Sequence, residues 1–218
     1  MTRFSSVKHS LTSGRYALAS LLYLSIGFGL ALLLARTMIT GIFAFYFLCW
    51  NLFLAALPVF FAWIASTRTG WKKWVGYAAW ILFLPNSFYI LTDLFHLRER
   101  PGVPLWFDLT LILSFAWNGC ALGLLSVRMV ERKIAYRSRI PEFVWIYLFM
   151  LLNAFGVYIG RYWRYNSWDV LARPLDLISD IAGVFFHPVV YRDVWAMSIC
   201  FAFPMTIFYL ILKWMRRG

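Results

Sequence analysis

The sequence predicts an all-α membrane protein: a bundle of six transmembrane helices, with both chain termini in the cytoplasm. Two observations predict the bundle. Of the 218 residues, 62% are hydrophobic and only 14% are charged, whereas a soluble domain is about 45–50% apolar and about 25% charged. Six uncharged runs also have close to the roughly 20 residues that a helix needs to cross the hydrocarbon core. Backbone polar groups in lipid must bond internally, so these runs are expected to be helical.

The helices are expected at about residues 16–35, 42–65, 74–92, 109–127, 143–160 and 194–212. The whole chain, 1–218, would form one integral membrane domain, with a basic cytoplasmic tail at 1–15 and an outer loop at 161–193. The first run follows basic residues, as a signal peptide would. No small-x-small cleavage pattern follows it, which favours a retained membrane anchor.

The distribution of charge predicts the orientation in a bacterial inner membrane. The side that holds both termini carries 14 of the 21 Lys and Arg residues, and cytoplasmic loops are the ones enriched in these residues. Seven of the nine acids fall on the outer side, so the net charge of +12 lies on the cytoplasmic side. Within the outer loop, Pro174 can open a helix through about Phe186. Its alternating apolar and polar faces predict an amphipathic helix at the membrane interface.

Two polar motifs lie at the predicted outer ends of the third and fifth helices. Asn86, Tyr89, Asp93 and His96 follow the spacing i, i+3, i+7, i+10, which places them on one face of a continuous helix. At the end of the fifth run, two glycines in the pattern Gly-x3-Gly, at 156 and 160, allow a neighbouring helix to approach closely.

The same segment continues with Arg161 and Arg164. Two guanidinium groups about one turn apart suit a phosphate or a carboxylate.

These segments carry a resemblance to a known family. The stretch 80–97, with its Phe-Leu-Pro-Asn-x-x-Tyr-x-x-Thr-Asp-x-x-His-Leu pattern, and the later Tyr-x-Gly-Arg-x-x-Arg-x-Asn-Ser-Trp-Asp pattern at 158–169 resemble a bacterial membrane-protein family catalogued as domain of unknown function 1361. The resemblance spans roughly residues 30–212 and implies membership and topology but no reaction. The positions that match the family motifs are Asn86, Thr92, Asp93, His96, Arg161, Arg164, Asn166 and Asp169.

We therefore expect a polar pocket at the outer leaflet that binds a phosphate-bearing lipid or another anion. Asp93 and His96 are the candidates for acid–base catalysis, since His can exchange protons near neutral pH. The candidate ligand-binding residues are Asn86, Arg161, Arg164, Asn166, Asp169 and Asp108, the last at the outer start of the fourth helix. An alternative places a metal on Asp93, His96 and His187.

Two other functions remain open at this point. The protein could be a structural or partner subunit in which the outer charges only pair with each other and Asn51, Asn118 and Asn153 bond between helices. It could also be a small transporter or lipid-handling protein with a polar pathway through the membrane. The sequence contains no haem, flavin or nucleotide motif, and membrane lipids rather than nucleic acid are the expected partners. Whether the protein is an enzyme is left open.

Overall fold

The computed structural model describes residues 2–134 and 141–215, and this part of the chain is helical with no β-strand. In chain order the elements are α1 (Thr2–Thr40), α2 (Phe47–Thr67), α3 (Trp71–Tyr89), the 3-10 helix η1 (Ile90–His96), α4 (Leu105–Ile134), α5 (Glu142–Tyr162), α6 (Asp169–Ala172), α7 (Pro174–Phe186) and α8 (Arg192–Met215).

Six of these segments are long and apolar enough to cross a membrane, which confirms the predicted number of spans. Large apolar side chains such as Leu24, Trp50, Phe53 and Phe203 are exposed on them. A soluble monomer rarely exposes apolar patches of this extent. The chain is thus a multi-pass membrane protein of the helical type. A helix also covers 174–186, the bounds expected for α7.

Most spans extend beyond the apolar runs that predicted them, whereas α2 begins at Phe47, inside its predicted run of 42–65. Helix α1 begins at Thr2, within the expected tail, and ends at Thr40, so that Arg36 is helical rather than part of an outer loop. Helix α4 takes in Asp108 at its start and Arg132 and Lys133 at its end. Charged residues end an apolar run without ending a helix, because Arg, Lys and Glu are good helix formers.

The third span changes its geometry near its C-terminal end. Helix α3 includes Pro85 and continues to Tyr89, and the chain then winds as the 3-10 helix η1, in which the Thr92 hydroxyl donates to the Tyr89 carbonyl. A 3-10 helix has three residues per turn instead of 3.6. The side chains of η1 therefore leave the face on which α3 would have continued them.

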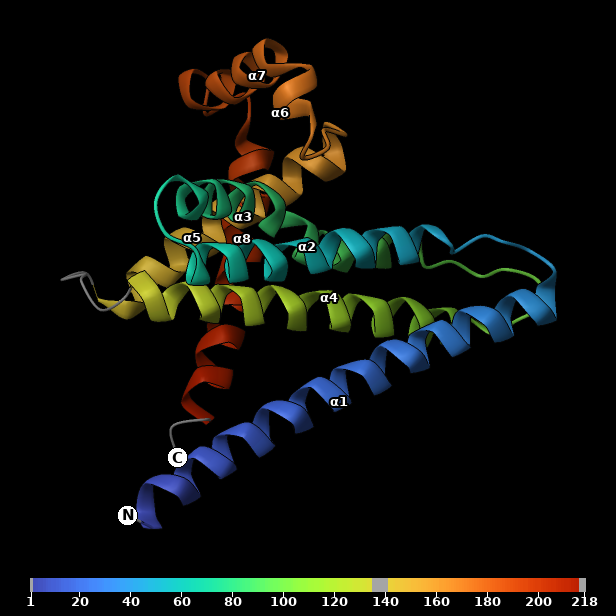
Figure 1. The fold of residues 1–218 in the computed structure, drawn as a ribbon. Helices are drawn as coiled ribbons and strands as arrows, with labels where there is room; N and C mark the ends of the chain where they lie inside the picture. The colour runs from blue at the N-terminus through green and yellow to red at the C-terminus, as the bar shows by residue number, and fades with distance from the viewer. Residues whose placement is uncertain (1, 135–140, 216–218) are drawn as a thin grey trace.

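Helix α4 is the centre of the bundle, since 61% of its most apolar stretch is buried, against 11–39% for the other spans. One core of buried side chains lies between α3, α4, α5 and α8, and a second lies between α1, α2, η1 and α4. Helix α8 packs mainly on α5. Figure 1 shows α1 beside α4 at the end of α1 and diverging from it toward the N-terminus, whereas α8 crosses the direction of α4 steeply, begins near the short helices α6 and α7 and ends on the opposite side.

Glycines permit the closest helix contacts, as the Gly-x3-Gly pattern of α5 predicts. A Cβ atom at Gly156 would lie 2.4 Å from the Cγ of Pro85 on α3, and one at Gly160 would lie 3.3 Å from the Tyr89 ring. The ring of Pro85 thus fills the space that a side chain at 156 would need. This contact fixes α5 beside the C-terminal half of α3.

Replacing Gly156 with alanine should therefore destabilise the protein by about 1–3 kcal/mol, because the added methyl group overpacks against a rigid proline ring. The matched control is Gly27→Ala, where a Cβ meets nothing within 4 Å. That variant should unfold no earlier than the wild type, since alanine is the better helix former. Thermal unfolding in detergent micelles measures both, and equal melting temperatures would contradict the packing argument.

Candidate functional site

Arg161, at the last turn of α5, is the centre of a polar cluster at the end of the bundle where α5 ends. Its Nη1 atom lies 3.7 Å from Oδ1 of Asp93 and its Nη2 atom lies 3.2 Å from Nε2 of His96. The guanidinium also lies over the rings of Tyr89 and Phe95, at 5.8 and 5.4 Å from their centroids. A guanidinium can only donate, so the contact with His96 is a hydrogen bond when Nε2 carries a lone pair.

The 3-10 geometry of η1 produces this convergence. Residues i and i+3 of a 3-10 helix eclipse each other, so Asp93 and His96 point to the same side. From α2, the Asn51 side chain donates to Oδ2 of Asp93 at 2.7 Å. Both carboxylate oxygens of this buried residue are thus engaged, and Asp93 acts as the group that positions Arg161. The guanidinium has five N–H donors, more than its three polar partners in the described residues, Asp93, Tyr89 and His96, require.

Asp108 belongs to a separate, buried ion-pair cluster. Its carboxylate accepts from Nε of Arg36 at 2.7 Å and from Arg100 at 3.4 Å. Arg36 and Asp108 are each only 1% exposed. The two guanidinium groups lie over the same Phe45 ring, at 4.5 and 4.6 Å. Arg100 also donates to the His96 carbonyl, which is the link between this cluster and that of Arg161.

A third group of polar residues holds the segment after α5. Asn86 donates to the Ser167 hydroxyl at 2.9 Å and so points away from Asp93, because the 3-10 turn separates their faces. The backbone N–H of Asn166 donates to Asp169 at 2.6 Å, and Arg173 pairs with the same carboxylate at 3.3 Å. These hydrogen bonds hold the pKa of Asp169 below its usual range, with the Asn166 N–H as the main cause.

Arg164 and His187 stay outside these clusters. Arg164 is exposed and adopts a left-handed backbone conformation, with φ of 59°, which turns the chain after α5. Its side chain is not brought to Arg161. His187 caps the exposed end of α7. Among the residues whose side chains the structure describes (17–133 and 141–215), no three His, Cys, Asp or Glu side chains converge to hold a metal, so the set of Asp93, His96 and His187 is not assembled.

The opposite end of the bundle contains a polar cluster that the sequence patterns did not reveal. Glu131 of α4 accepts hydrogen bonds from Tyr209 and Lys213 of α8, and Lys213 also pairs with Glu142 at the start of α5. Glu131 and Lys213 are buried. The pattern that could have indicated the cluster is the i, i+4 spacing of Tyr209 and Lys213, which puts both on one face of a helix.

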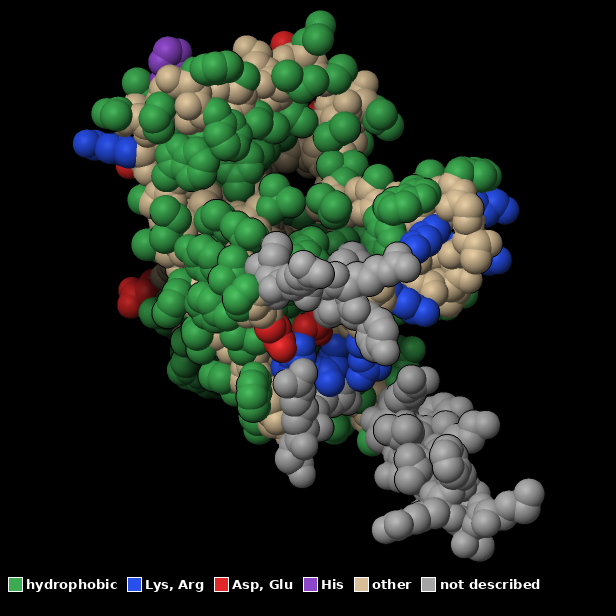
Figure 2. Space-filling view, turned by 90° about the vertical axis from the view of Figure 1, so that its left-hand side faces the viewer, with side chains coloured by type: hydrophobic (Ala, Val, Ile, Leu, Met, Phe, Trp, Pro, Cys, Tyr) green, Lys and Arg blue, Asp and Glu red, His purple; other side chains and the backbone are tan. Residues whose placement is uncertain are grey.

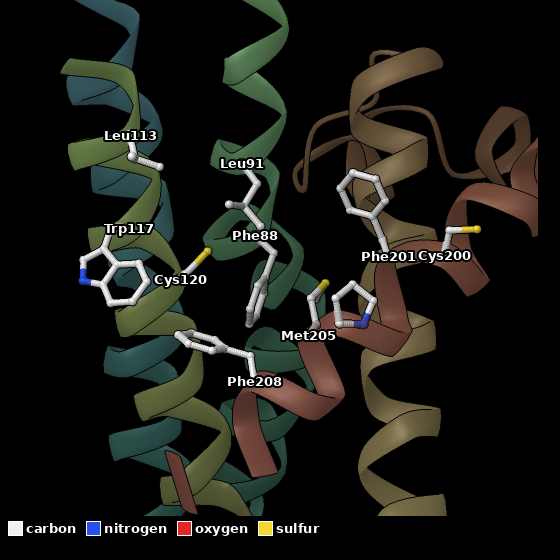
Figure 3. A pocket seen from close by; sticks show the side chains of 10 residues that line it. Phe88, Leu91, Leu113, Trp117, Cys120, Cys200, Phe201, Met205 and Phe208 are labelled. Carbon is white, nitrogen blue, oxygen red and sulfur yellow. The ribbon is translucent and has the colours of Figure 1, made fainter. Parts of the chain in front are cut away.

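Two cavities lie along α8. The one drawn in Figure 3 has a volume of about 430 Å³ and lies between α4 (Leu113, Trp117, Cys120), the third span (Phe88, Leu91) and α8. The second, of about 470 Å³, lies between η1, α5 and α8, and its walls include Phe95, Tyr158, Tyr162 and Asp193. Phe201 of α8 lines both cavities, and Phe95 in the wall of the second is a ring over which the Arg161 guanidinium lies.

A family model described as protein of unknown function (DUF1361) matches residues 50–209, and the chain belongs to this family. The match covers α2 to α8 and includes the residues of the Arg161 cluster. Neither the curated proteins nor the solved structures gave a match.

Removal of the carboxylate in Asp108→Ala should cost about 3–5 kcal/mol, because it leaves the Arg36 guanidinium buried without its counter-charge. The double variant Arg36→Met with Asp108→Ala should recover most of this loss, since no buried charge is then left unpaired. A double-mutant cycle on thermal unfolding in micelles measures the coupling. Strictly additive losses would contradict a direct ion pair.

The carboxylate of Asp169 should titrate below the ordinary value of about 3.9. Its lowered folded-state pKa means that its hydrogen bonds stabilise the loop above the unfolded pKa and are lost as pH falls through the folded pKa. The amide shift of Asn166 in an NMR titration from pH 6 to pH 2 reports this midpoint. Asp169→Asn should abolish the titration, and a wild-type midpoint at or above the ordinary value would refute the assignment.

Proposed function

We propose that this member of the family binds a phosphate-bearing lipid of the outer leaflet, with the head group beside Arg161 and an acyl chain in the cavity between α4 and α8. The observation that carries the proposal is that Phe201 lines both the apolar cavity and the cavity that includes Asp193. An amphiphile needs an apolar slot that opens toward a polar end, and the wall formed by Phe95 lies under the Arg161 guanidinium. Both volumes fall in the range of roughly 300–1,000 Å³ that is usual for ligand sites.

The charges around the second cavity favour a zwitterionic head group. The Arg161 guanidinium has more N–H donors than its polar partners in the described residues require, so it can bind a phosphate. The exposed carboxylate of Asp193 and the side chains of Tyr158 and Tyr162 line the same cavity. An acid would repel a purely anionic head, whereas it attracts an ammonium group. A phosphate with an attached amine, as in phosphatidylethanolamine, satisfies both charges.

The proposed membrane topology would place this site at the outer leaflet. With the 14 Lys and Arg of one side in the cytoplasm, Arg161 and Asp93 lie at the outer surface of a bacterial inner membrane. Helix α7 would then rest on the outer interface. Its exposed apolar side chains, among them Leu175, Ile178 and Phe185, support that position.

A purely structural role is the second candidate, and the ion pairs favour it. Asp93 with Arg161, and Asp108 with Arg36, use charges that a ligand would otherwise meet. This role leaves the two cavities without an explanation. Transport of a polar solute is less well supported, because the residues that line the cavity of about 430 Å³ are all apolar. A charged group would have to cross them without compensation.

The proposal can be tested by a substitution that fills the cavity and leaves every charged residue unchanged. Leu113 lines it and is 47% exposed, so Leu113→Trp can enlarge the side chain there without disturbing the core. We expect native mass spectrometry of the full chain with phosphatidylethanolamine to show at least about fivefold weaker binding, because the chain slot is occupied. The matched control is Leu148→Trp on α5, 53% exposed and lining none of the cavities described above.

A second variant, Arg161→Lys, keeps the positive charge beside Asp93 but loses the guanidinium fork. It should weaken binding of the same lipid while the unfolding temperature changes little. Equal lipid binding by the two tryptophan variants would overturn the site. Unchanged binding by Arg161→Lys would overturn the assignment of the head group to Arg161.

A further inference from the structure

A third cavity lies at the other end of α8, beside the polar cluster of Glu131. It has a volume of about 410 Å³ and is bounded by α1, α4 and α8. Its walls are almost entirely aliphatic, with two cations among them, and the lining residues are Leu18, Ala121, Leu124, Leu125, Arg128, Tyr209, Leu212, Lys213 and Met215. An aliphatic slot with cations at one end has the polarity of an acidic lipid.

The two cations of this cavity differ in their partners. Lys213 pairs with Glu131 and Glu142, so its charge is compensated. The Nε atom of Arg128 is buried and has no hydrogen-bond partner within the described part of the chain. A buried N–H of a charged group without an acceptor is costly. Arg128 is therefore the group that an anion would satisfy.

Basic residues near the cavity add positive charge. Arg132 and Lys133 follow one turn after Arg128 on α4 and are exposed. Figure 2 views the molecule from the end where α4 ends and α5 begins, and shows Lys and Arg side chains gathered beside acidic ones within a hydrophobic surface. Such a surface attracts the anionic lipids of the adjacent leaflet, at about 1 kcal/mol per basic residue.

We propose that this cavity binds an anionic phospholipid from the leaflet at the α4 C-terminal end. One acyl chain lies among Leu18, Leu124, Leu125 and Leu212, and the phosphate accepts hydrogen bonds from Arg128. The guanidinium fork matches two phosphate oxygens at once. A second copy of the chain fits this surface less well, because it would bring another excess of positive charge against the first.

The site is independent of the one proposed beside Arg161. The residues that line this cavity do not overlap with those of the two cavities assigned to the site beside Arg161, and the all-apolar one of those two would not accept a phosphate. The head-group preference is also opposite. The outer site has an acid at its cavity, whereas the inner one presents Arg128 with a basic surround, so the inner site should select phosphatidylglycerol over phosphatidylcholine.

The experiment titrates the full chain in micelles with phosphatidylglycerol or phosphatidylcholine and counts bound lipids by native mass spectrometry. Arg128→Gln should weaken binding of one phosphatidylglycerol roughly tenfold, the value of a charged hydrogen bond lost, and leave phosphatidylcholine unchanged. The matched control is Lys133→Gln, which removes the same charge from an exposed position outside the cavity. It should alter binding by less than about twofold, as surface charges do.

If Arg128→Gln unfolds, a substitution in the apolar lining of the cavity still tests whether the lipid binds there. Leu125→Trp leaves every charge in place and fills the slot, so it should also reduce binding of phosphatidylglycerol. Equal losses from Arg128→Gln and Lys133→Gln would mean that only diffuse charge attracts the lipid, and would overturn the site. Equal affinity of the wild type for the two lipids would overturn it as well.

Discussion

The structure depends on two buried carboxylates, one near each end of α4. Asp108 holds α1 through Arg36, and Glu131 holds α8 through Tyr209 and Lys213. Each carboxylate would be very costly in an apolar surrounding without these partners. The longest and most buried span thus fixes its neighbours at its two ends. Its middle is mostly apolar and carries no acid, and there Trp80 of α3 donates a hydrogen bond to Ser126.

The cavities follow from that arrangement. Helix α8 is fixed to α4 at the Glu131 end and packs along α5, but crosses α4 at a steep angle. Two helices that cross in this way touch over a short length, and here Trp117 and Phe208 make the contact with ring centroids 5.6 Å apart. On either side of it the helices diverge and leave apolar space. In a bilayer such space is filled by lipid chains, so a crossing helix clamped at one end provides lipid-sized slots as a consequence of its geometry.

The sequence predicted the six spans because the cost of exposing charge to hydrocarbon decides where a helix crosses. It could not predict where each helix ends, since a helix continues past the hydrocarbon, and Arg36 was therefore assigned to a loop.

The convergence of Asp93, His96 and Arg161 was predicted from their common depth at the predicted outer helix ends, and the structure brings these three together. Asn86 departs from them because η1 is a 3-10 helix, and Arg164 because its positive φ turns the chain. Of the three asparagines expected to bond between helices, Asn51 does so, whereas Asn118 bonds within its own helix and Asn153 has no partner in the described residues. The i, i+4 spacing of Tyr209 and Lys213 indicates a shared helix face, but it does not identify Glu131, 82 positions away from Lys213, as their partner.

The charge asymmetry of the chain gives the two proposed lipid sites different selectivities. In the proposed topology acids and bases are equal in number on the outer side. There Asp93 pairs with Arg161 and accepts from Asn51, while the exposed Asp193 lines the second cavity. A balanced site of this kind suits a head group that carries both charges. On the other side the bases outnumber the acids, and while Lys213 pairs with Glu131 and Glu142, the Nε of Arg128 lacks an acceptor among the described residues. A net anion is what the proposed site there requires. In the proposed topology, the excess of basic residues that would place this end in the cytoplasm would thus also set which lipid binds there.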